Sequence, residues 1–255
     1  MISQDRNFDD LIDNFSERIC STEKGSWRIK LLKEDISSIL PIDANWNILD
    51  AGCGMGQMAL WLAQRKPRHQ LTLCDLSEKM LGQAKQSFQN AGIEATFIQG
   101  AVQELAKTDT DFDLVLFHAV MEWMANPISG LESVISRVKS GGLLSLMFYN
   151  RNAMVYANVL KGQWRLKPIL EDSYIGKGNK LSPPNPQYPN EITSLLEKSG
   201  LTIVKHTGIR VFHDYMTPEV LKKTDEKELF KLESQYCRMP VYRDMGRYVH
   251  ILAKK

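Results

Sequence analysis

The sequence predicts an α/β fold built on a mostly parallel sheet that carries helices on both faces. From residue 47 onward, short apolar runs alternate with segments of helical periodicity. The run at 114–117 is apolar throughout, as in parallel strands that are covered on both sides. The first apolar run, 48–49, leads through a glycine-rich turn into the helix-like segment 58–63. A strand, a turn and a helix in this order begin a typical α/β unit.

The elements follow one another in a regular order. Helices are expected at 7–20 and 27–39, ahead of the sheet, because apolar residues recur there at helical spacing. Strands are predicted at 47–51, 70–75, 95–99, 112–118, 143–149, 201–204, 209–212 and 247–253. Further helices are predicted at 56–65, 77–91, 128–138, 190–199 and 218–237. Ser77 is a suitable N-cap, Gly92 a suitable helix stop, and Gly141-Gly142 a turn into the fifth strand.

Residues 151–190 interrupt this alternation. They are rich in glycine and proline, and only one short helix, at 152–161, is expected in them. Basic residues outnumber acidic ones after residue 150, although the net charge of the whole chain is only +2. A polyanionic partner or a solvated basic loop would both explain this bias. We expect one domain over 1–255, with an N-terminal helical cap at 1–40 and a basic insertion at 151–190.

The glycine-rich turn reads Asp50-x-Gly52-x-Gly54-x-Gly56, and Asp75 ends the next apolar run. Glycines let a ligand approach the backbone, and the following helix offers unpaired N–H groups. An acid at the end of the second strand is suited to hydrogen-bond a ribose. The spacing differs from the G-x-G-x-x-G of dinucleotide sites. A nucleotide-type cofactor is predicted, and a plain strand–turn–helix connection is the alternative.

This turn resembles the first motif of class I S-adenosylmethionine-dependent methyltransferases. Further strings are similar to the bacterial tRNA 5-carboxymethoxyuridine methyltransferases from about residue 4 to 253: QDRNFDD (4–10), LFHAVMEW (116–123), LSLMFYN (144–150), RVFHDY (210–215) and GRYVH (246–250). The resemblance implies a seven-stranded, Rossmann-like sheet whose last strand runs antiparallel. It implies methylation of the carboxylate of 5-carboxymethoxyuridine at the tRNA wobble position, with the anticodon stem-loop as partner. The likeness is weakest in 151–190.

The resemblance also implies positions for the cofactor S-adenosylmethionine. Arg28 would meet its carboxylate, Asp75 its ribose, and His118 would lie beneath its methionine portion. The remaining positions belong to the glycine turn and to the adenine site: Asp50, Gly52, Cys53, Gly54, Val102 and Gln103. Without the resemblance, Arg28 would be interpreted as a charged residue on the surface of a helix, and His118 as a hydrogen-bonded residue at the end of a strand. Asp50 is equally suited to hold the N–H groups of the loop.

The reaction that the resemblance implies needs little general acid–base catalysis. A substrate carboxylate is ionised at neutral pH, so catalysis consists of aligning one oxygen with the methyl group and excluding water. Arginine, tyrosine and histidine are the natural groups to hold a carboxylate. The candidates are Tyr149, Arg210, His213, Tyr215 and Arg247. For Arg210 and Arg247, a phosphate contact or a structural salt bridge is the alternative.

Composition and residue spacing bear on the cellular location of the protein and on metal binding. The N-terminus is polar and acidic, unlike a signal peptide, and no apolar stretch is long enough for a membrane span. The cysteines are scattered and the histidines show no metal spacing, so we expect a cytoplasmic protein without a metal. Two other functions stay open: a small-molecule carboxyl or quinone O-methyltransferase of the same fold, and a noncatalytic module that binds S-adenosylmethionine or RNA.

Overall fold

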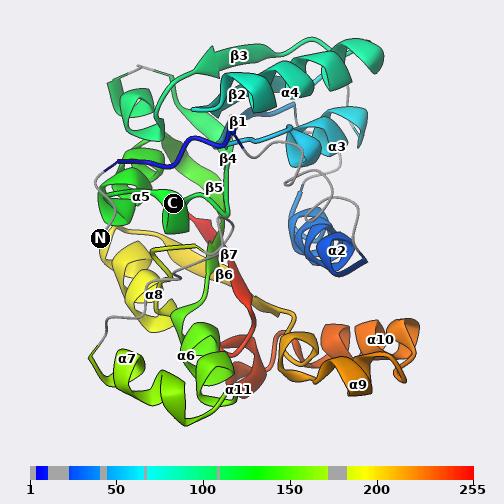
Figure 1. Cartoon of the computed structure of the whole chain (residues 1–255). Coiled ribbons are helices and arrows are strands. Elements are labelled where there is room, and N and C mark those ends of the chain that lie inside the picture. The colour runs from blue at the N-terminus through cyan, green and yellow to red at the C-terminus, as the bar shows by residue number, and fades with distance from the viewer. Residues whose placement is uncertain (1–3, 11–22, 41–44, 66–67, 108–109, 172–182) are drawn as a thin grey trace.

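The computed structural model describes residues 4–10, 23–40, 45–65, 68–107, 110–171 and 183–255. Within them, a 7-stranded sheet has the order β3-β2-β1-β4-β5-β7-β6 (Figure 1). The pairs from β3 through β5 are parallel, and β7 runs antiparallel to both β5 and β6. The predicted α/β class is therefore confirmed, including the antiparallel last strand.

The described chain forms the following elements. The strands are β1 Asn47–Ala51, β2 Gln70–Asp75, β3 Thr96–Gln99, β4 Phe112–His118, β5 Val138–Tyr149, β6 Thr202–Ile209 and β7 Tyr248–Lys254. The α-helices are α2 Glu23–Ser37, α3 Gln57–Arg65, α4 Glu78–Asn90, α5 Pro127–Ser136, α6 Arg151–Val159, α7 Leu166–Leu170, α8 Pro189–Lys198, α9 Pro218–Leu221, α10 Glu226–Tyr236 and α11 Pro240–Arg243. Short 3-10 helices are η2 Val102–Lys107, η3 Met121–Trp123, η4 Gln163–Arg165 and η5 His213–Tyr215.

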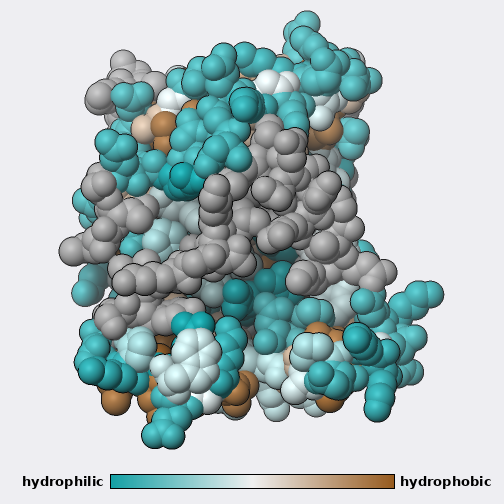
Figure 2. Space-filling view, in the orientation of Figure 1, coloured by the Kyte–Doolittle hydropathy of each residue, from teal (hydrophilic) through white to brown (hydrophobic). Residues whose placement is uncertain are grey.

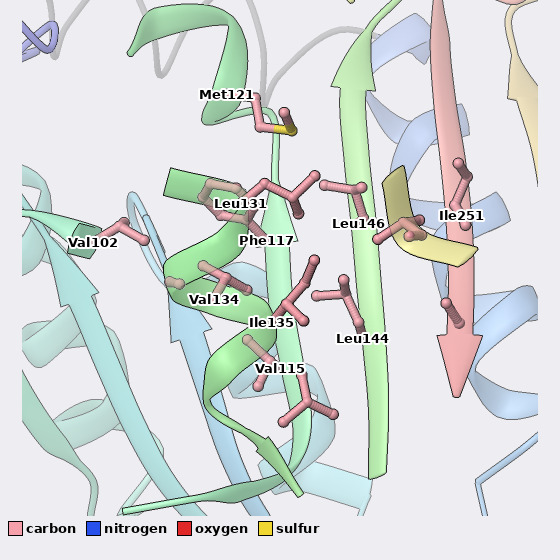
Figure 3. Close-up of a cluster of buried hydrophobic side chains, with 14 of the residues drawn as sticks. Val102, Val115, Phe117, Met121, Leu131, Val134, Ile135, Leu144, Leu146 and Ile251 are labelled. Carbon is pink, nitrogen blue, oxygen red and sulfur yellow. The ribbon is translucent and has the colours of Figure 1, made fainter. Parts of the chain in front are cut away.

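Helices cover both faces of the sheet. On one face, α5 and α8 enclose a cluster that includes Val115 and Phe117 of β4 and Leu144 of β5 (Figure 3). On the other face, Leu114 and Leu116 of β4 belong to a second cluster, which contains residues of α2 and α3. Alternate residues of a strand point to opposite faces. The continuous apolar run at 114–117 therefore buries both of its sides, as predicted.

Several predicted helices have other bounds than expected. Residues 7–10 are not helical, because the Asn7 side chain accepts a hydrogen bond from the Asp9 N–H (2.8 Å) and favours a turn. The rest of the predicted helix 7–20 lies outside the described residues. The helix predicted at 128–138 ends at 136. The long helix predicted at 218–237 is divided into α9 and α10. Asp225 starts the second one by capping the Glu228 N–H (2.9 Å).

The closing strands also differ from the prediction. The two pieces predicted at 201–204 and 209–212 form one strand, β6, which has a bulge between Ile203 and Lys205. The strand ends because Arg210 adopts a left-handed backbone conformation (φ 61°). Gly141 and Gly142 lie inside β5 rather than ahead of it.

Other predicted boundaries hold. Ser77 caps α4 by accepting from the Met80 N–H, and Gly92 follows the helix with φ 65°. The short helix predicted at 152–161 corresponds to α6. The prediction that 151–190 contains only this one helix was wrong, because η4 and α7 follow α6 in the described part of the segment, and α8 begins at Pro189.

Candidate functional site

A pocket opens at the carboxyl ends of β1, β2 and β4, between the glycine turn and helix α2. Ligands of open α/β sheets bind at this edge. The lining contains most residues that the sequence assigned to a cofactor: Arg28, Asp50, Gly52, Cys53, Gly54, Asp75, Val102 and His118. Gln103 is not part of the lining. Its side-chain Nε2 instead donates to Asp5 Oδ2 (2.9 Å), which does reach the pocket.

The glycine turn requires glycine for two separate reasons. Gly52, Gly54 and Gly56 all have positive φ angles, between 53° and 73°, a conformation that L side chains rarely adopt. At Gly52, an added Cβ would also lie 2.3 Å from Cγ2 of Val120. The described non-glycine residues with positive φ are Ala119 and Arg210, so Cys53 fits the turn with an ordinary backbone.

Asp75 holds the turn in shape. Its Oδ2 accepts from the Gly54 N–H (2.7 Å), and its Oδ1 accepts from the Ser77 N–H (2.8 Å). Each carboxylate oxygen has further lone pairs, so Asp75 can accept additional hydrogen bonds from a ligand. Burial raises the pKa of Asp75, and burial together with the nearby Asp75 charge raises the pKa of Asp50 to about 7.

Cys53 contributes a neutral thiol to the pocket wall. Its Sγ donates to the Gly54 carbonyl (3.4 Å). Burial, followed by the charges of Asp50 and Asp75, raises the pKa of this thiol well above its ordinary value. Cys53 therefore contacts a ligand as a small, weakly polar group and not as a thiolate.

Residues 5–9 cover one side of the pocket, but without the helix that was predicted to begin at residue 7. Asp5 accepts from the Ala125 N–H (2.7 Å), and Asp9 accepts from the Ser77 hydroxyl (2.6 Å). The Phe8 ring packs edge-on against Trp123, with the ring centroids 4.9 Å apart. Asp5, Phe8 and Trp123 all line the pocket. The string at 4–10 signalled the family, but nothing local in it shows which distant groups it contacts.

A second group of candidate residues, the Asp214 cluster, consists of Arg210, His213 and Arg247 around Asp214, which was not among the predicted site residues. Arg210 donates to Asp214 Oδ2 through Nε (3.1 Å), and His213 Nδ1 lies 2.9 Å from Oδ1. The Arg247 Nε lies 3.6 Å from Oδ2, an ion pair rather than a hydrogen bond. Burial raises the pKa of Asp214, but His213 and the two arginines outweigh it and hold this pKa at about 2.

Tyrosines connect the Asp214 cluster to the pocket. The Tyr248 ring lines the pocket, with the guanidinium of Arg28 6.0 Å from its centroid and that of Arg210 5.5 Å away. The Arg247 guanidinium lies 4.7 Å from the centroid of the Tyr149 ring, which packs edge-on against Tyr248. All three of these arginine–tyrosine contacts lie within cation–π distance. The Asp214 cluster and the pocket are therefore neighbouring parts of one site.

The last candidate, Tyr215, uses its hydroxyl inside the protein. The hydroxyl donates to the Met245 carbonyl (2.5 Å), and burial raises the pKa of Tyr215. The structure thus brings all five candidates for the substrate carboxylate close to Asp214. Arg210, His213 and Arg247 pair with Asp214, and the Tyr215 hydroxyl is bonded to a backbone carbonyl.

Two buried polar residues support the Asp214 cluster. Asn150 donates to the carbonyls of Asp244 and Gly246 (both 2.8 Å), and so ties the end of β5 to the loop before β7. Glu233 of α10 accepts from the N–H groups of Val211, Phe212 and His213 (2.6, 3.0 and 2.8 Å). Neither role could be predicted from local sequence, because each partner is distant along the chain.

Comparisons with known proteins agree with this architecture. A family model described as a methyltransferase domain matches residues 48–142. The tRNA 5-carboxymethoxyuridine methyltransferase of Escherichia coli (strain K12) is 39% identical over 99% of this chain and 97% of its own length. The chain belongs to the tRNA 5-carboxymethoxyuridine methyltransferase family.

More distant relatives share part of the chain or only its fold. The ubiquinone biosynthesis O-methyltransferase of Ruegeria sp. (strain TM1040) is 29% identical over 65% of this chain and 64% of its own length. The crystal structure of magnesium protoporphyrin IX methyltransferase from Synechocystis PCC 6803 superposes with a TM-score of 0.63. It covers 97% of this chain and 96% of its own at 16% identity. At that identity, the superposition supports the methyltransferase fold alone.

Three further findings concern the described part of this methyltransferase. No group of His, Cys, Asp and Glu side chains there has an arrangement that would hold a metal ion. Among the helices of the same residues, none combines the length and the apolar character that crossing a membrane requires. The described cysteines Cys53, Cys74 and Cys237 are free thiols.

Proposed function

We propose that this protein transfers a methyl group from S-adenosylmethionine to the carboxylate of 5-carboxymethoxyuridine at the wobble position of tRNA, giving the methyl ester. The observation that carries this proposal is the contact between the pocket and the Asp214 cluster through Tyr248. A methyl-donor site and a cationic site are thereby adjacent, as the esterification of an anionic substrate requires. Family membership at 39% identity over nearly the whole chain supports the same reaction.

The residues of the pocket fit the cofactor. The three glycines of the turn leave the backbone open to it, and a Cβ at Gly52 would already collide with Val120. Arg28 would bind its carboxylate, Asp75 its ribose hydroxyls, and Val102 would pack beside its adenine. When bound, S-adenosylmethionine supplies a methyl group that its sulfonium already activates.

Arg247 is our principal candidate for holding the substrate carboxylate. Its side chain is 32% exposed, whereas that of Arg210 is 13% exposed. Its 3.6 Å contact with Asp214 leaves guanidinium donors for a second carboxylate. Because the substrate carboxylate is ionised at neutral pH, the protein needs no general base. Arg247 and the neighbouring Tyr149 would orient one oxygen and leave the other open to the methyl group.

Positive charge continues from Arg247 into the segment that follows α6. Burial, and then the charges of Arg165 and Arg247, lower the pKa of Lys161. A cation whose pKa falls beside other cations is stabilised by an arriving anion. Trp164 is 65% exposed, and the Arg165 guanidinium lies 3.8 Å from its ring centroid. Aromatic and basic side chains together suit stacking on unpaired bases and contact with phosphates.

We propose that this segment receives the anticodon stem-loop. The part of the face in Figure 2 that is not grey is largely hydrophilic; small hydrophobic areas lie at its lower left, where Figure 1 places α6 and α7, and others lie at the upper left and on the right. In this proposal the chain is one domain, residues 1–40 form a cap over the cofactor, and 151–190 form an insertion that recognises RNA. A tRNA substrate places the protein in the cytoplasm.

A deletion strain tests the proposed function. Nucleosides from its bulk tRNA are digested and analysed by mass spectrometry. The free acid is expected to accumulate, and the ester to return when the gene is supplied again. Complementation with Arg247→Ala is expected to leave the acid. Arg137→Ala, at the amino ends of β4 and β5 and therefore at the opposite edge of the sheet from the pocket, should restore the ester. Unchanged ester in the deletion strain would contradict the proposal and favour a small-molecule substrate.

A further inference from the structure

A buried chain of hydrogen bonds leads from the surface of the protein to the pocket. Arg238 donates to Asp35 Oδ1 through Nε (3.0 Å) and Nη2 (2.7 Å). Asp35 Oδ2 lies 2.8 Å from His250 Nδ1, and His250 Nε2 lies 2.9 Å from Ser145 Oγ. Ser145 Oγ lies 2.8 Å from Nε2 of His118, which lines the pocket. Asp35, His250 and Ser145 are buried.

Ser145 couples the hydrogen bonds on its two sides, so that they must all run in the same donor-to-acceptor direction. Ser145 has one hydroxyl proton and contacts the Nε2 atoms of both histidines. If it donates to His250, it must accept from His118, and the reverse also holds. Which nitrogen of His118 carries the proton therefore depends on whether His250 Nε2 is a donor or an acceptor.

Asp35 determines which ring nitrogen of His250 carries a proton. Its carboxylate faces Nδ1, so that nitrogen carries a proton. Burial raises the pKa of Asp35, but the bonds from His250 and Arg238 hold it at about 2, so the carboxylate is ionised. Arg238 already pairs with this charge through two hydrogen bonds. A second cation on the fully buried His250 ring would be unfavourable, because desolvating an imidazolium is costly.

A neutral His250 with its proton on Nδ1 has a lone pair on Nε2, so the Ser145 hydroxyl donates to it. Ser145 then accepts from a proton on His118 Nε2. Burial above all lowers the pKa of His118 well below its ordinary value, so this ring is also neutral. Its Nδ1 is left with a lone pair.

We infer that Asp35 is a positioning residue that, through His250 and Ser145, holds His118 in the tautomer whose Nδ1 is a hydrogen-bond acceptor in the pocket. This acceptor recognises a cationic donor, which in the proposed function is the α-ammonium group of the cofactor. The inference rests on the proposed function only for the identity of that ligand. The tautomer itself is a property of the ligand-free protein.

Nitrogen-15 NMR of histidine-labelled, ligand-free protein tests the tautomer directly, with His118→Asn used to assign the signals. The wild type is expected to show His118 protonated on Nε2. In Asp35→Asn, the amide oxygen must stay on Arg238, so the amide NH₂ faces His250 Nδ1. That change reverses every donor in the chain and moves the His118 proton to Nδ1. Glu34→Gln, at the other, exposed carboxylate on Arg238, is the matched control and should change nothing.

Binding of S-adenosylhomocysteine gives a second readout. Because hydrogen bonds to charged groups are among the stronger ones, Asp35→Asn should raise its Kd at least about tenfold. A wild-type His118 protonated on Nδ1, or an Asp35→Asn variant that keeps the proton on Nε2, would overturn the inference.

If Asp35→Asn does not fold, Ser145→Ala replaces it. That variant interrupts the chain and should leave His118 in a mixture of tautomers, and a single retained tautomer would also overturn the inference. A wild type that shows the expected tautomer but does not bind S-adenosylhomocysteine would instead count against the proposed function.

Discussion

Substitution of Gly52 should destabilise the protein more than the same substitution of Gly54. Both residues have positive φ angles, 73° and 53°. Alanine in that region costs about 1–2 kcal/mol. Only at Gly52 does the new Cβ collide, 2.3 Å from Cγ2 of Val120, whereas at Gly54 the nearest side-chain atom is Sδ of Met80 at 3.8 Å. Overpacking of this kind adds about 1–3 kcal/mol.

Urea unfolding of the ligand-free protein measures this difference. We expect Gly54→Ala to lower the free energy of unfolding by about 1–2 kcal/mol, and Gly52→Ala by about 2–5 kcal/mol. The denaturant slopes should be equal, so that the midpoints report stability.

Removing the obstructing side chain supplies the control. In a Val120→Ala background, Gly52→Ala should cost no more than Gly54→Ala does in the wild type, because the two colliding methyl groups are gone. Equal losses for the two single variants, or no relief from Val120→Ala, would refute this account of the turn.

Three further outcomes follow from individual contacts. Gly82 lies exposed within α4 with nothing near its Cβ position, so Gly82→Ala should stabilise the protein by about 1 kcal/mol in thermal or urea unfolding. Glu233→Gln replaces one accepting oxygen with a donor facing the N–H groups of residues 211–213, and should cost about 1–3 kcal/mol while weakening tRNA binding more than cofactor binding. The pKa values of Asp35 and Asp214 are held at about 2, below the unfolded value of 3.8. Each carboxylate therefore stabilises the folded protein above pH 4, and this stabilisation is lost as the pH falls toward 2. Unfolding measured across an acid titration should show a loss of about 2 kcal/mol for each carboxylate. Stability that stays constant between pH 4 and 2 would contradict the ion pairs.

Features that depend on neighbouring residues were predictable from the sequence. The glycine turn, the Ser77 cap and the continuous strand at 114–117 each depend on residues that are close along the chain. Their geometry follows from local sterics and periodicity. The same kind of reasoning failed for β6. Its polar middle, Lys205 to Thr207, suggested a break, but pairing with β7 carries the strand across it.

Features that depend on tertiary contacts were not predictable. Asp35 and His250 are 215 positions apart, and Asn150 and Gly246 are 96 apart. No spacing rule connects such pairs, and each becomes meaningful only when the sheet brings its strands together. The need to hold a carboxylate pointed to Arg210 and Arg247 as candidates, yet only the fold shows that they share Asp214 and differ in exposure.

The most direct test of the central claim is methyl transfer by the purified protein. Bulk tRNA from the deletion strain is incubated with the protein and S-adenosylmethionine that carries a deuterated methyl group, and the nucleosides are analysed by mass spectrometry. The account predicts that the deuterated methyl appears on the carboxylate of 5-carboxymethoxyuridine, as an ester that mild base removes. A label on a ring carbon or nitrogen, or no label in a protein that binds S-adenosylhomocysteine, would contradict it.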